Sequence, residues 1–381
     1  MIQNKPEIKK NKNKVIFHID LNQFFCSCAI IKEPYLKGKK IAVGGDAILQ
    51  KGIISTASYE ARKFGVHSAM SVKDALNLVP DLIVVPIDFS LYIKKSKQFF
   101  KLLSEYTEFL VEGSIDEGYL DITKLSEARS PLEIAKEIQD RLLNEYNLPC
   151  SIGISFTLFL AKMASDLKKP LGITLIRKND IIPSIYSLPI EDMFGIGKKT
   201  YPILKEMGIN KIGDFTKESN KDKILSIMSY DLYQSYLNCL LGKSSNIVDP
   251  SKYSIPKSIS TETTLNGIVS DFETILSAIK TLYERVHKQL CGYGMLGKTF
   301  GLKFKDANFK SITRSKTSTF YTNDYDNGLR MLTNILEEYY NDQEIKLVGV
   351  YISNLINKQD LKDEEYNLFT YEKILRRLGL F

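Results

Sequence analysis

Residues 109–123 read "FLVEGSIDEGYLDIT", and this stretch predicts two strands joined by a tight turn in which Gly118 relaxes the backbone. It places Asp116 directly beside Glu117. Adjacent carboxylates repel each other, and an Asp-Glu pair ordinarily marks a solvated turn. Strands on both sides would hold this turn rigid, which favours a second interpretation, a site for a bound cation.

A third carboxylate strengthens the second interpretation. Asp20 follows "VIFHI", residues 15–19, a short run rich in β-branched residues that predicts a buried strand. Ligands and chemistry collect at strand ends in sheets of this kind. Three carboxylates are about the number that holds two Mg²⁺ ions ~3.5–4 Å apart for displacement at a phosphate. Because Asp and Glu are common residues, spacing alone leaves both interpretations open.

The rest of the chain predicts an α+β fold. Further strands are expected at 40–45, 52–58, 81–85 and 150–155, and helices at 92–109 and 131–146. From about 180 to 246 the pattern is helical, and a linker containing Pro and Ser is expected at 249–258. Strands and helices return between 259 and 355, including a long amphipathic helix at 271–290.

The composition limits the class of protein. A chain of 381 residues is long enough for about two to four domains. Its 44% hydrophobic and 25% charged residues are typical of a soluble globular protein, and no run approaches the ~20 apolar residues of a membrane span. The basic segment "MIQNKPEIKKNKNK" lacks the apolar part of a secretion signal, so a cytoplasmic location is expected. A net charge of +7 permits a nucleic-acid partner without requiring one.

The cysteines and histidines predict neither a metal site nor catalysis. The five cysteines are odd in number and scattered, which is typical of a reducing compartment. Cys26 and Cys28 form a C-x-C, but no further cysteine pair or histidine lies near them to complete a zinc site. His18, His67 and His287 are far apart in the sequence, so a structural role is expected for each.

Five longer segments occur in one order along the chain: "HIDLNQFF", "STASYEARKFGV", "SIDEGYLDIT", "LAKMASDLKKPLGI" and "FGIGKKTYPILKEMGI". Their order and spacing resemble those of the Y-family translesion DNA polymerases, and the DinB type is the most similar. The resemblance covers roughly residues 14–355. It implies a right hand with palm, fingers and helical thumb, followed by a C-terminal α/β little finger domain.

The resemblance also implies where the domains begin and end. The expected parts are a disordered basic lead (1–14), a palm (15–23 and 89–177), fingers (24–88), a thumb with a helix-hairpin-helix (178–246), a linker (247–258), a little finger (259–356) and a tail (357–381).

Metal ligands follow from the same resemblance. Two Mg²⁺ ions would be held by the side chains and one backbone carbonyl of Asp20, Leu21, Asp116 and Glu117. The two aspartates would bridge both ions, and the glutamate would hold the ion near the primer 3′ hydroxyl. The chain departs from the family at two positions: Asn22 stands where a second Asp is frequent, and Gly118 stands where Ala is usual.

The resemblance further implies a nucleotide pocket. Phe25 would be a steric gate that leaves no room for a ribose 2′ hydroxyl, with Phe24 beside it, although both rings are typical of a core on composition alone. Tyr59 and Arg62, three residues apart on one helix face, would contact the triphosphate. Lys169, otherwise an ordinary loop lysine, would reach the triphosphate from the palm.

Two regions are expected to bind the DNA backbone. The segment "FGIGKKTYPILKEMGI" resembles a helix-hairpin-helix, whose phosphate-binding loop would contain Gly195, Gly197, Lys198 and Lys199. In the little finger, phosphates would be contacted by Lys303, Lys305 and Arg314. In the tail, Leu368 and Phe369 resemble the end of a peptide that docks on a sliding clamp, and the terminal "LGLF" is an alternative.

The implied function is that of a template-directed, low-fidelity DNA polymerase that extends a primer with deoxynucleoside triphosphates, including across damaged template bases. The expected partners are primer–template DNA, deoxynucleoside triphosphates and a sliding clamp, with the polymerase a monomer that needs no membrane. A lesion-bypass subunit of the UmuC type, a nucleotidyl cyclase and an inactive DNA-binding scaffold are the alternatives. A cyclase would not need the helix-hairpin-helix or the basic C-terminal domain.

Overall fold

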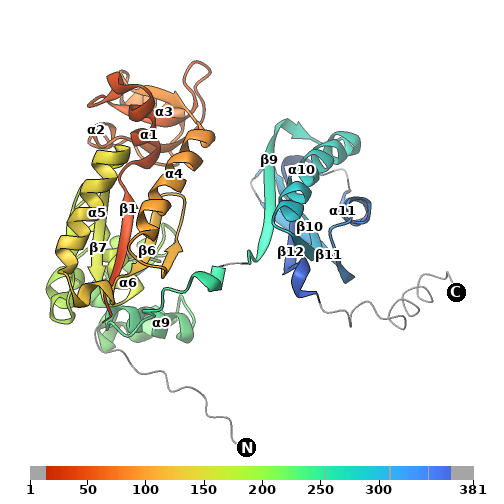
Figure 1. Cartoon of the computed structure of the whole chain (residues 1–381). Coiled ribbons are helices and arrows are strands. Elements are labelled where there is room, and N and C mark those ends of the chain that lie inside the picture. Colours follow the sequence, from red (N-terminus) through yellow and green to blue (C-terminus); the bar gives the residue numbers. More distant parts are fainter. Residues whose placement is uncertain (1–13, 254, 309, 342, 362–381) are drawn as a thin grey trace, which may run out of the picture. The chain divides into compact units, whose positions relative to one another are not determined.

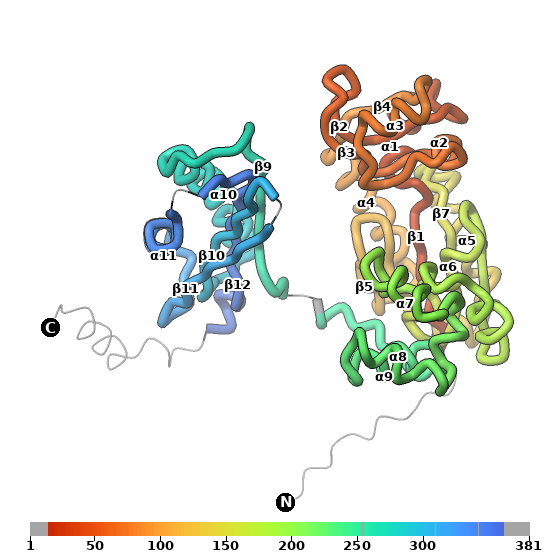
Figure 2. Tube along the Cα trace, turned by 180° about the vertical axis from the view of Figure 1, so that it is seen from behind, coloured from red at the N-terminus to blue at the C-terminus, as the bar shows by residue number. Residues whose placement is uncertain are grey.

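The computed structural model describes residues 14–361, except Ser254, Phe309 and Asp342. Contacts between Cα atoms divide the chain between Pro250 and Ser251 into two compact units. Figures 1 and 2 show the helices and strands of these units from opposite sides. Within the described residues, no helix is both long enough and apolar enough to cross a bilayer.

The first unit contains strands and short helices in a mixed order. Its strands are β1 (Ile16–Leu21), β2 (Ile41–Asp46), β3 (Lys51–Ala57), β4 (Ile83–Pro86), β5 (Leu110–Glu112), β6 (Glu117–Asp121), β7 (Cys150–Ser155) and β8 (Ile173–Leu175). Its α-helices are α1 (Phe24–Lys32), α2 (Tyr59–Arg62), α3 (Val72–Leu78), α4 (Phe89–Ser104), α5 (Pro131–Tyr146), α6 (Leu158–Asp166), α7 (Tyr201–Glu206), α8 (Lys221–Leu225) and α9 (Tyr230–Leu240).

The main sheet of this unit has the strand order β5-β6-β1-β7-β8. β1 lies in its centre, antiparallel to both β6 and β7 (Figure 1). Because successive side chains alternate between faces, Phe17 and Ile19 pack into one core with residues of α4 and α5. The intervening His18 points to the opposite face, where its Nδ1 lies 2.8 Å from Ser165 Oγ on α6. The sheet is therefore covered on both faces, which explains the continuous apolar pattern of β1.

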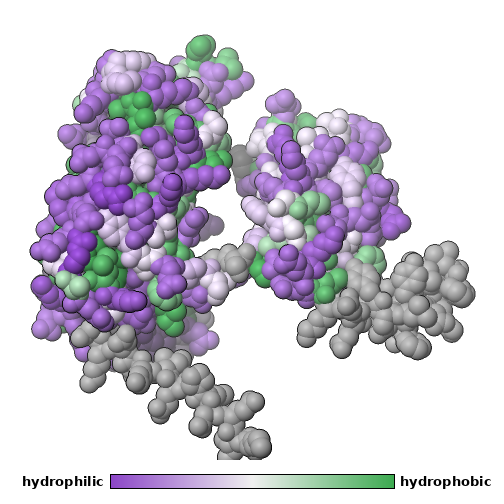
Figure 3. Space-filling model, in the orientation of Figure 1, coloured by the Kyte–Doolittle hydropathy of each residue, from purple (hydrophilic) through white to green (hydrophobic). Residues whose placement is uncertain are grey.

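Two further cores belong to the first unit. The three-stranded sheet β3-β2-β4 and α3 share a small core that includes Ile54 and Val72. The region from α7 to α9 consists of short helices around a separate core that includes Leu204, Phe215 and Tyr233. On the face drawn in Figure 3, hydrophilic residues cover most of this unit, as expected when its apolar side chains fill such cores.

The second unit is a four-stranded antiparallel sheet with helices on one face (Figure 1). The strand order is β11-β10-β12-β9, formed by β9 (Ser258–Val269), β10 (Met295–Asp306), β11 (Ser311–Thr322) and β12 (Ile345–Asn357). Phe300, Leu302 and Phe304 point from β10 into a core shared with α10 (Phe272–Gly292) and α11 (Tyr325–Tyr339). The alternate residues of β10, including Lys303 and Lys305, therefore lie on the other face of the sheet.

Several element predictions can be compared directly with the structure. The bounds of α5 and β7 are as predicted, whereas the helix expected at 92–109 runs from Phe89 to Ser104. Its start is fixed by Asp88, whose side chain accepts a hydrogen bond from the backbone N–H of Leu91. Asp88 is thus the sequence signal that marks the start of α4, and the prediction did not use it.

The prediction that Gly118 relaxes the turn is wrong. Gly118 lies inside β6, opposite Ile19 of β1, and the turn ends before it. A Cβ at this position would come within 3.0 Å of the Phe100 ring. Glycine therefore gives the Phe100 ring room in the core, and an alanine would require the ring to move by a few tenths of an ångström.

Candidate active site

The pairing of β1 with β6 makes the three predicted acidic residues, here called the acidic group, neighbours on two adjacent strands. Asp20 lies directly opposite Glu117 in the antiparallel register, so their side chains leave the same face of the sheet. Asp116 precedes Glu117, and its backbone carbonyl accepts a hydrogen bond from the N–H of Leu21 at 2.9 Å. A slip of one residue would turn Asp20 to the opposite face, so the buried apolar positions of β1 also fix its carboxylate.

The carboxylates of this group influence one another. Burial is the main reason why the pKa of Asp116 is raised, and the neighbouring charges of Asp20 and Glu117 raise it further. A hydrogen bond of 2.6 Å from the hydroxyl of Ser114 acts in the opposite direction. The site is thus a concentration of negative charge that a cation would stabilise.

Two lysine ammonium groups lie against these carboxylates. Lys169 Nζ is 2.9 Å from Asp20 Oδ2 and 2.7 Å from Asp166 Oδ1. Lys162 Nζ is 2.5 Å from Glu117 Oε2. Lys162 was missed by the sequence analysis, and the available signal was a single lysine within the apolar run of α6, "LFLAKMASD".

Glu117 has a second neighbour in His18. The pKa of Glu117 is lowered to about 2, first by the His18 side chain and then by the ammonium group of Lys162. His18 Nε2 lies 3.5 Å from Glu117 Oε2, which is long for a hydrogen bond, so the lysine is the closer partner. Burial lowers the pKa of His18 itself. Both neighbours favour an ionised Glu117.

The chemistry of the donors fits Mg²⁺, although the side chains are not gathered around one point. Among the described residues, no three His, Cys, Asp or Glu side chains stand close enough together to hold a metal ion. Oxygens of Asp20 and Glu117 are paired with lysines. Carboxylate and carbonyl oxygens are nevertheless the ligands that Mg²⁺ takes, and the residues that carry them are adjacent across two strands.

The residues predicted to contact a triphosphate lie close to this group. The backbone N–H of Tyr59, at the start of α2, donates to the Gln23 side chain at 2.8 Å. The Arg62 guanidinium lies 5.1 Å from the centre of the Tyr59 ring, and its Nε donates to Ala57 O at 2.9 Å. Burial raises the pKa of Tyr59, on which the charges of Arg62 and Lys169 also act. Tyr59 and Arg62 therefore lie side by side, and Lys169 is near enough for its charge to act on the Tyr59 hydroxyl.

The two predicted pocket phenylalanines have different environments. Phe24 is 2% exposed and belongs to the core of the main sheet. Phe25 is only partly buried, and its ring stacks on Tyr92 with the centroids 4.1 Å apart and the planes 12° apart. Of the two rings, Phe25 is therefore the one that keeps some exposed surface, and its stack on Tyr92 limits its movement.

The predicted helix-hairpin-helix loop is exposed at its polar positions and anchored by its apolar one. Ile196 is buried in the core of the short helices, while Lys198 and Lys199 are exposed. Gly195 has a φ of +95°, and its carbonyl accepts a hydrogen bond from Tyr236 at 2.9 Å. The positive φ favours glycine here, and a Cβ, which would come within 2.8 Å of the Tyr236 hydroxyl, would also require the Tyr236 side chain to shift.

The basic residues of the second unit do not all lie together. Lys303 and Lys305 are on the face without helices, where Lys303 Nζ is 2.6 Å from Glu262 Oε2 of β9. Arg314 lies instead over the Tyr339 ring of α11, 5.0 Å from its centre, on the helix side. Its strand pairing with Leu302 explains this, since Leu302 points into the core. The tail residues Leu368 and Phe369 lie outside the described residues.

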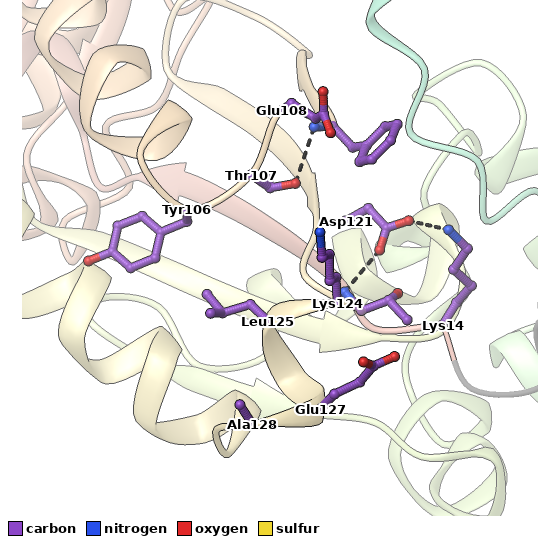
Figure 4. A pocket seen from close by; sticks show the side chains of 11 residues that line it. Lys14, Tyr106, Thr107, Glu108, Asp121, Lys124, Leu125, Glu127 and Ala128 are labelled. Atoms are coloured by element: carbon purple, nitrogen blue, oxygen red, sulfur yellow. Dashed lines mark hydrogen bonds and ion pairs between the residues drawn. The ribbon is translucent and has the colours of Figure 1, made fainter.

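A separate pocket of about 540 Å³ lies at the other end of β1 and contains none of the predicted site residues. Its polar walls include Lys14 and Asp121, which form an ion pair with each other (Figure 4). Asp121 also accepts a hydrogen bond from the backbone N–H of Thr123 at 3.0 Å. Lys14 and Asp121 are thus already paired with each other.

Two models of one protein family match this chain. The model of the impB/mucB/samB family matches residues 19–166, which include the acidic group, and the model of the family's C-terminal domain matches residues 256–364. This chain belongs to the impB/mucB/samB family. The first range contains β5, β6, β7 and the end of β1, and the second contains the whole sheet of the second unit.

Relatives within the impB/mucB/samB family are similar along nearly the whole chain. A protein of Oceanobacillus iheyensis named DNA polymerase IV is 37% identical over 370 residues, which are 97% of this chain and 87% of the relative. The Bacillus subtilis protein named DNA polymerase IV 1 is 36% identical over 364 residues, covering 95% and 87%. The resemblance to Y-family translesion DNA polymerases of the DinB type is therefore confirmed.

Solved structures confirm the fold class. A Y-family DNA polymerase chimera aligns with a TM-score of 0.79 at 24% identity, covering 90% of this chain and 99% of the other. DinB from Sulfolobus solfataricus aligns over the same shares with a TM-score of 0.63. This member of the impB/mucB/samB family thus has the α+β right-hand polymerase fold with a C-terminal sheet domain.

Proposed function

We propose that this protein is a template-directed DNA polymerase of the lesion-bypass type. It extends a primer with deoxynucleoside triphosphates, including opposite damaged template bases, with low fidelity. The observation that carries the proposal is the register of β1 and β6, which sets Asp20 opposite Glu117 and beside Asp116 in a chain whose relatives are named DNA polymerase IV. In the reaction, the primer 3′ oxygen attacks the α-phosphate of the nucleotide, and pyrophosphate leaves.

The acidic group would bind the metal ions of this reaction. Asp20 and Asp116 would bridge two Mg²⁺ ions, Glu117 would bind the one near the primer terminus, and the carbonyl of Leu21 would complete the set. When bound, two such ions activate the attacking hydroxyl and stabilise the leaving oxygen. Lys162 and Lys169, which now pair with Glu117 and Asp20, would then bind other groups. For Lys169 this group would be the triphosphate, since its charge already acts on Tyr59.

Two surfaces would hold the DNA. Lys198 and Lys199 beside the glycine loop, and Lys303 and Lys305 on the open face of the second sheet, offer cations to phosphates without reading sequence. Arg314, on the helix side, is left out of this proposal. The proposed domain map is that of the resemblance: palm, fingers, thumb and little finger, with a monomer that works in the cytoplasm and docks on a sliding clamp through Leu368 and Phe369.

Primer extension tests the whole proposal. The full-length protein is expected to extend a primer across an undamaged and an abasic template position with Mg²⁺, and to stop when the metal is chelated. The same preparation is incubated with nucleoside triphosphates alone, where formation of a cyclic product would favour a nucleotidyl cyclase instead. Extension that persists in excess chelator would remove the metal-dependent mechanism.

The loop lysines give a second prediction. Replacing Lys198 and Lys199 together by alanine is expected to weaken DNA binding about equally for all sequences and to reduce the slope of log K against log salt by about 2, because each lysine neutralises about one phosphate. Fluorescence anisotropy with labelled primer–template at several salt concentrations measures both. Lys94 and Lys97, exposed on α4, provide the matched double substitution. An unchanged salt slope in the loop variant would assign the DNA contact elsewhere.

A further inference from the structure

The side chain of Asn22 is not part of the acidic group, although it follows Asp20 by two residues. It is 1% exposed. Its Oδ1 accepts a hydrogen bond from the backbone N–H of Leu171 at 2.8 Å, and its Nδ2 donates to Ser151 Oγ at 3.0 Å. The carboxamide therefore joins the end of β1 to β7 and to the loop that follows α6.

Leu171 is held from its other side as well. Its carbonyl accepts a hydrogen bond from Gln139 Nε2 at 3.0 Å, and the same nitrogen donates to Cys150 O at 3.0 Å. Leu171 has a φ of +62°, a left-handed conformation that a leucine rarely adopts. Such a conformation persists where surrounding contacts fix it, and here the buried side chains of Asn22 and Gln139 supply those contacts.

The loop fixed in this way presents Lys169. Two residues before Leu171, the Lys169 ammonium group reaches Asp20 at 2.9 Å, and its side chain is 24% exposed. Gly172, directly after Leu171, leaves no room for a Cβ, which would lie 1.8 Å from the carbonyl oxygen of Lys168. The backbone of this loop therefore folds back closely, with Gly172 against Lys168. The direction of the Lys169 side chain then depends on the hydrogen bonds that fix the backbone of Leu171.

We propose that Asn22 is a positioning residue for the incoming nucleotide, because its carboxamide fixes the 168–172 loop and so sets the place where Lys169 meets the triphosphate. The inference rests on the proposed function. It also explains why an asparagine works where the resemblance led us to expect an aspartate. The amide provides the acceptor for Leu171 and a donor for Ser151, without adding another buried negative charge beside Asp20.

The first test removes the carboxamide. Asn22→Leu keeps the branched shape of the side chain and loses its hydrogen bonds, and it is expected to raise both the KM for deoxynucleotide and the Kd of a fluorescent deoxynucleotide about tenfold, with kcat changed by less than about threefold. Asn22→Asp retains the oxygen facing Leu171, so both constants are expected to stay close to those of the wild type, while its buried charge lowers the melting temperature. Asn144→Leu, the same change on the exposed side of α5, is the control. Equal constants in the wild type and Asn22→Leu would overturn the inference.

The second test asks whether Asn22 acts through Lys169. In a Lys169→Ala background, Asn22→Leu is expected to have no further effect on the Kd, because the cation it positions is gone. Additive effects would show a purely structural role and would overturn the inference. If Asn22→Leu does not fold, as judged by its melting curve, Ser151→Ala loosens the carboxamide more mildly and must raise the Kd in the same direction. A wild-type protein that neither binds nucleotide nor extends a primer would instead refute the proposed function.

Discussion

Replacing Asp116 by asparagine is expected to lower kcat for primer extension by about 10³-fold, at the upper end of what the loss of one charge-stabilising group costs. The substitution keeps the shape of the side chain and removes the negative charge that would bridge the two metal ions. The affinity for primer–template DNA is expected to stay unchanged, because the proposed phosphate contacts lie on other elements. Single-turnover extension measures the rate, and anisotropy measures the DNA affinity.

The same substitution is expected to stabilise the fold. Burial and the charges of Asp20 and Glu117 raise the pKa of Asp116 in the folded protein. For an acid with a raised pKa, the stabilising contribution is present at low pH and is lost as the pH rises through the folded pKa. At neutral pH the ionised carboxylate therefore opposes folding, and asparagine relieves this cost. In chelator, the melting temperature of Asp116→Asn should exceed that of the wild type.

Glu112→Gln provides the matched control for this experiment. Glu112 is exposed at the end of β5, on the other side of the same turn, and its replacement is expected to change neither rate nor melting temperature. An Asp116→Asn variant that extends primers at the normal rate would show that the acidic group is not the catalytic centre. A slow variant that has also lost DNA affinity would favour a structural role for Asp116.

The sequence predicted the parts of this site that depend on local pattern. These are the buried run before Asp20 and the strand–turn–strand pattern around Asp116, whereas the pairing that sets Asp20 opposite Glu117 is seen only in the structure. Helix α5 was predicted correctly because a proline starts it and its apolar spacing is regular. In each case the signal lies within about twenty residues, and hydrophobic periodicity together with the positions of proline and glycine is enough to predict the element.

What the sequence did not predict depends on contacts between distant segments. Lys162 reaches Glu117 only because α6 packs on the face of the main sheet to which His18 points. Asn22 meets Leu171 across 149 positions of sequence. Arg314 and Lys303 looked like members of one basic cluster, but pairing of Arg314 with the inward-facing Leu302 places it on the opposite face. A one-dimensional pattern contains no information on which strands pair, so these relations required the fold.

Replacing Phe25 by alanine is expected to reduce the discrimination against ribonucleotides by about 10²-fold, the range over which the shape of a pocket separates substrates that differ by one small group. The ring can reject a 2′ hydroxyl only if it cannot move aside. Its stacking on Tyr92, with the planes 12° apart, prevents that movement, since Tyr92 is itself buried in the core. The measurement is the ratio of kcat/KM for a deoxynucleotide to that for the matching ribonucleotide.

Phe25→Tyr is the control, because it retains an aromatic ring of similar size at this position of α1. It keeps the ring and its stack on Tyr92, so the discrimination should remain within about threefold of the wild type. The loss in Phe25→Ala should appear mainly as faster ribonucleotide insertion, because enlarging the pocket removes a clash and does not alter the triphosphate contacts proposed for Tyr59, Arg62 and Lys169. If both variants discriminate like the wild type, the sugar is selected by another group, and Phe25 belongs to the wall of the core.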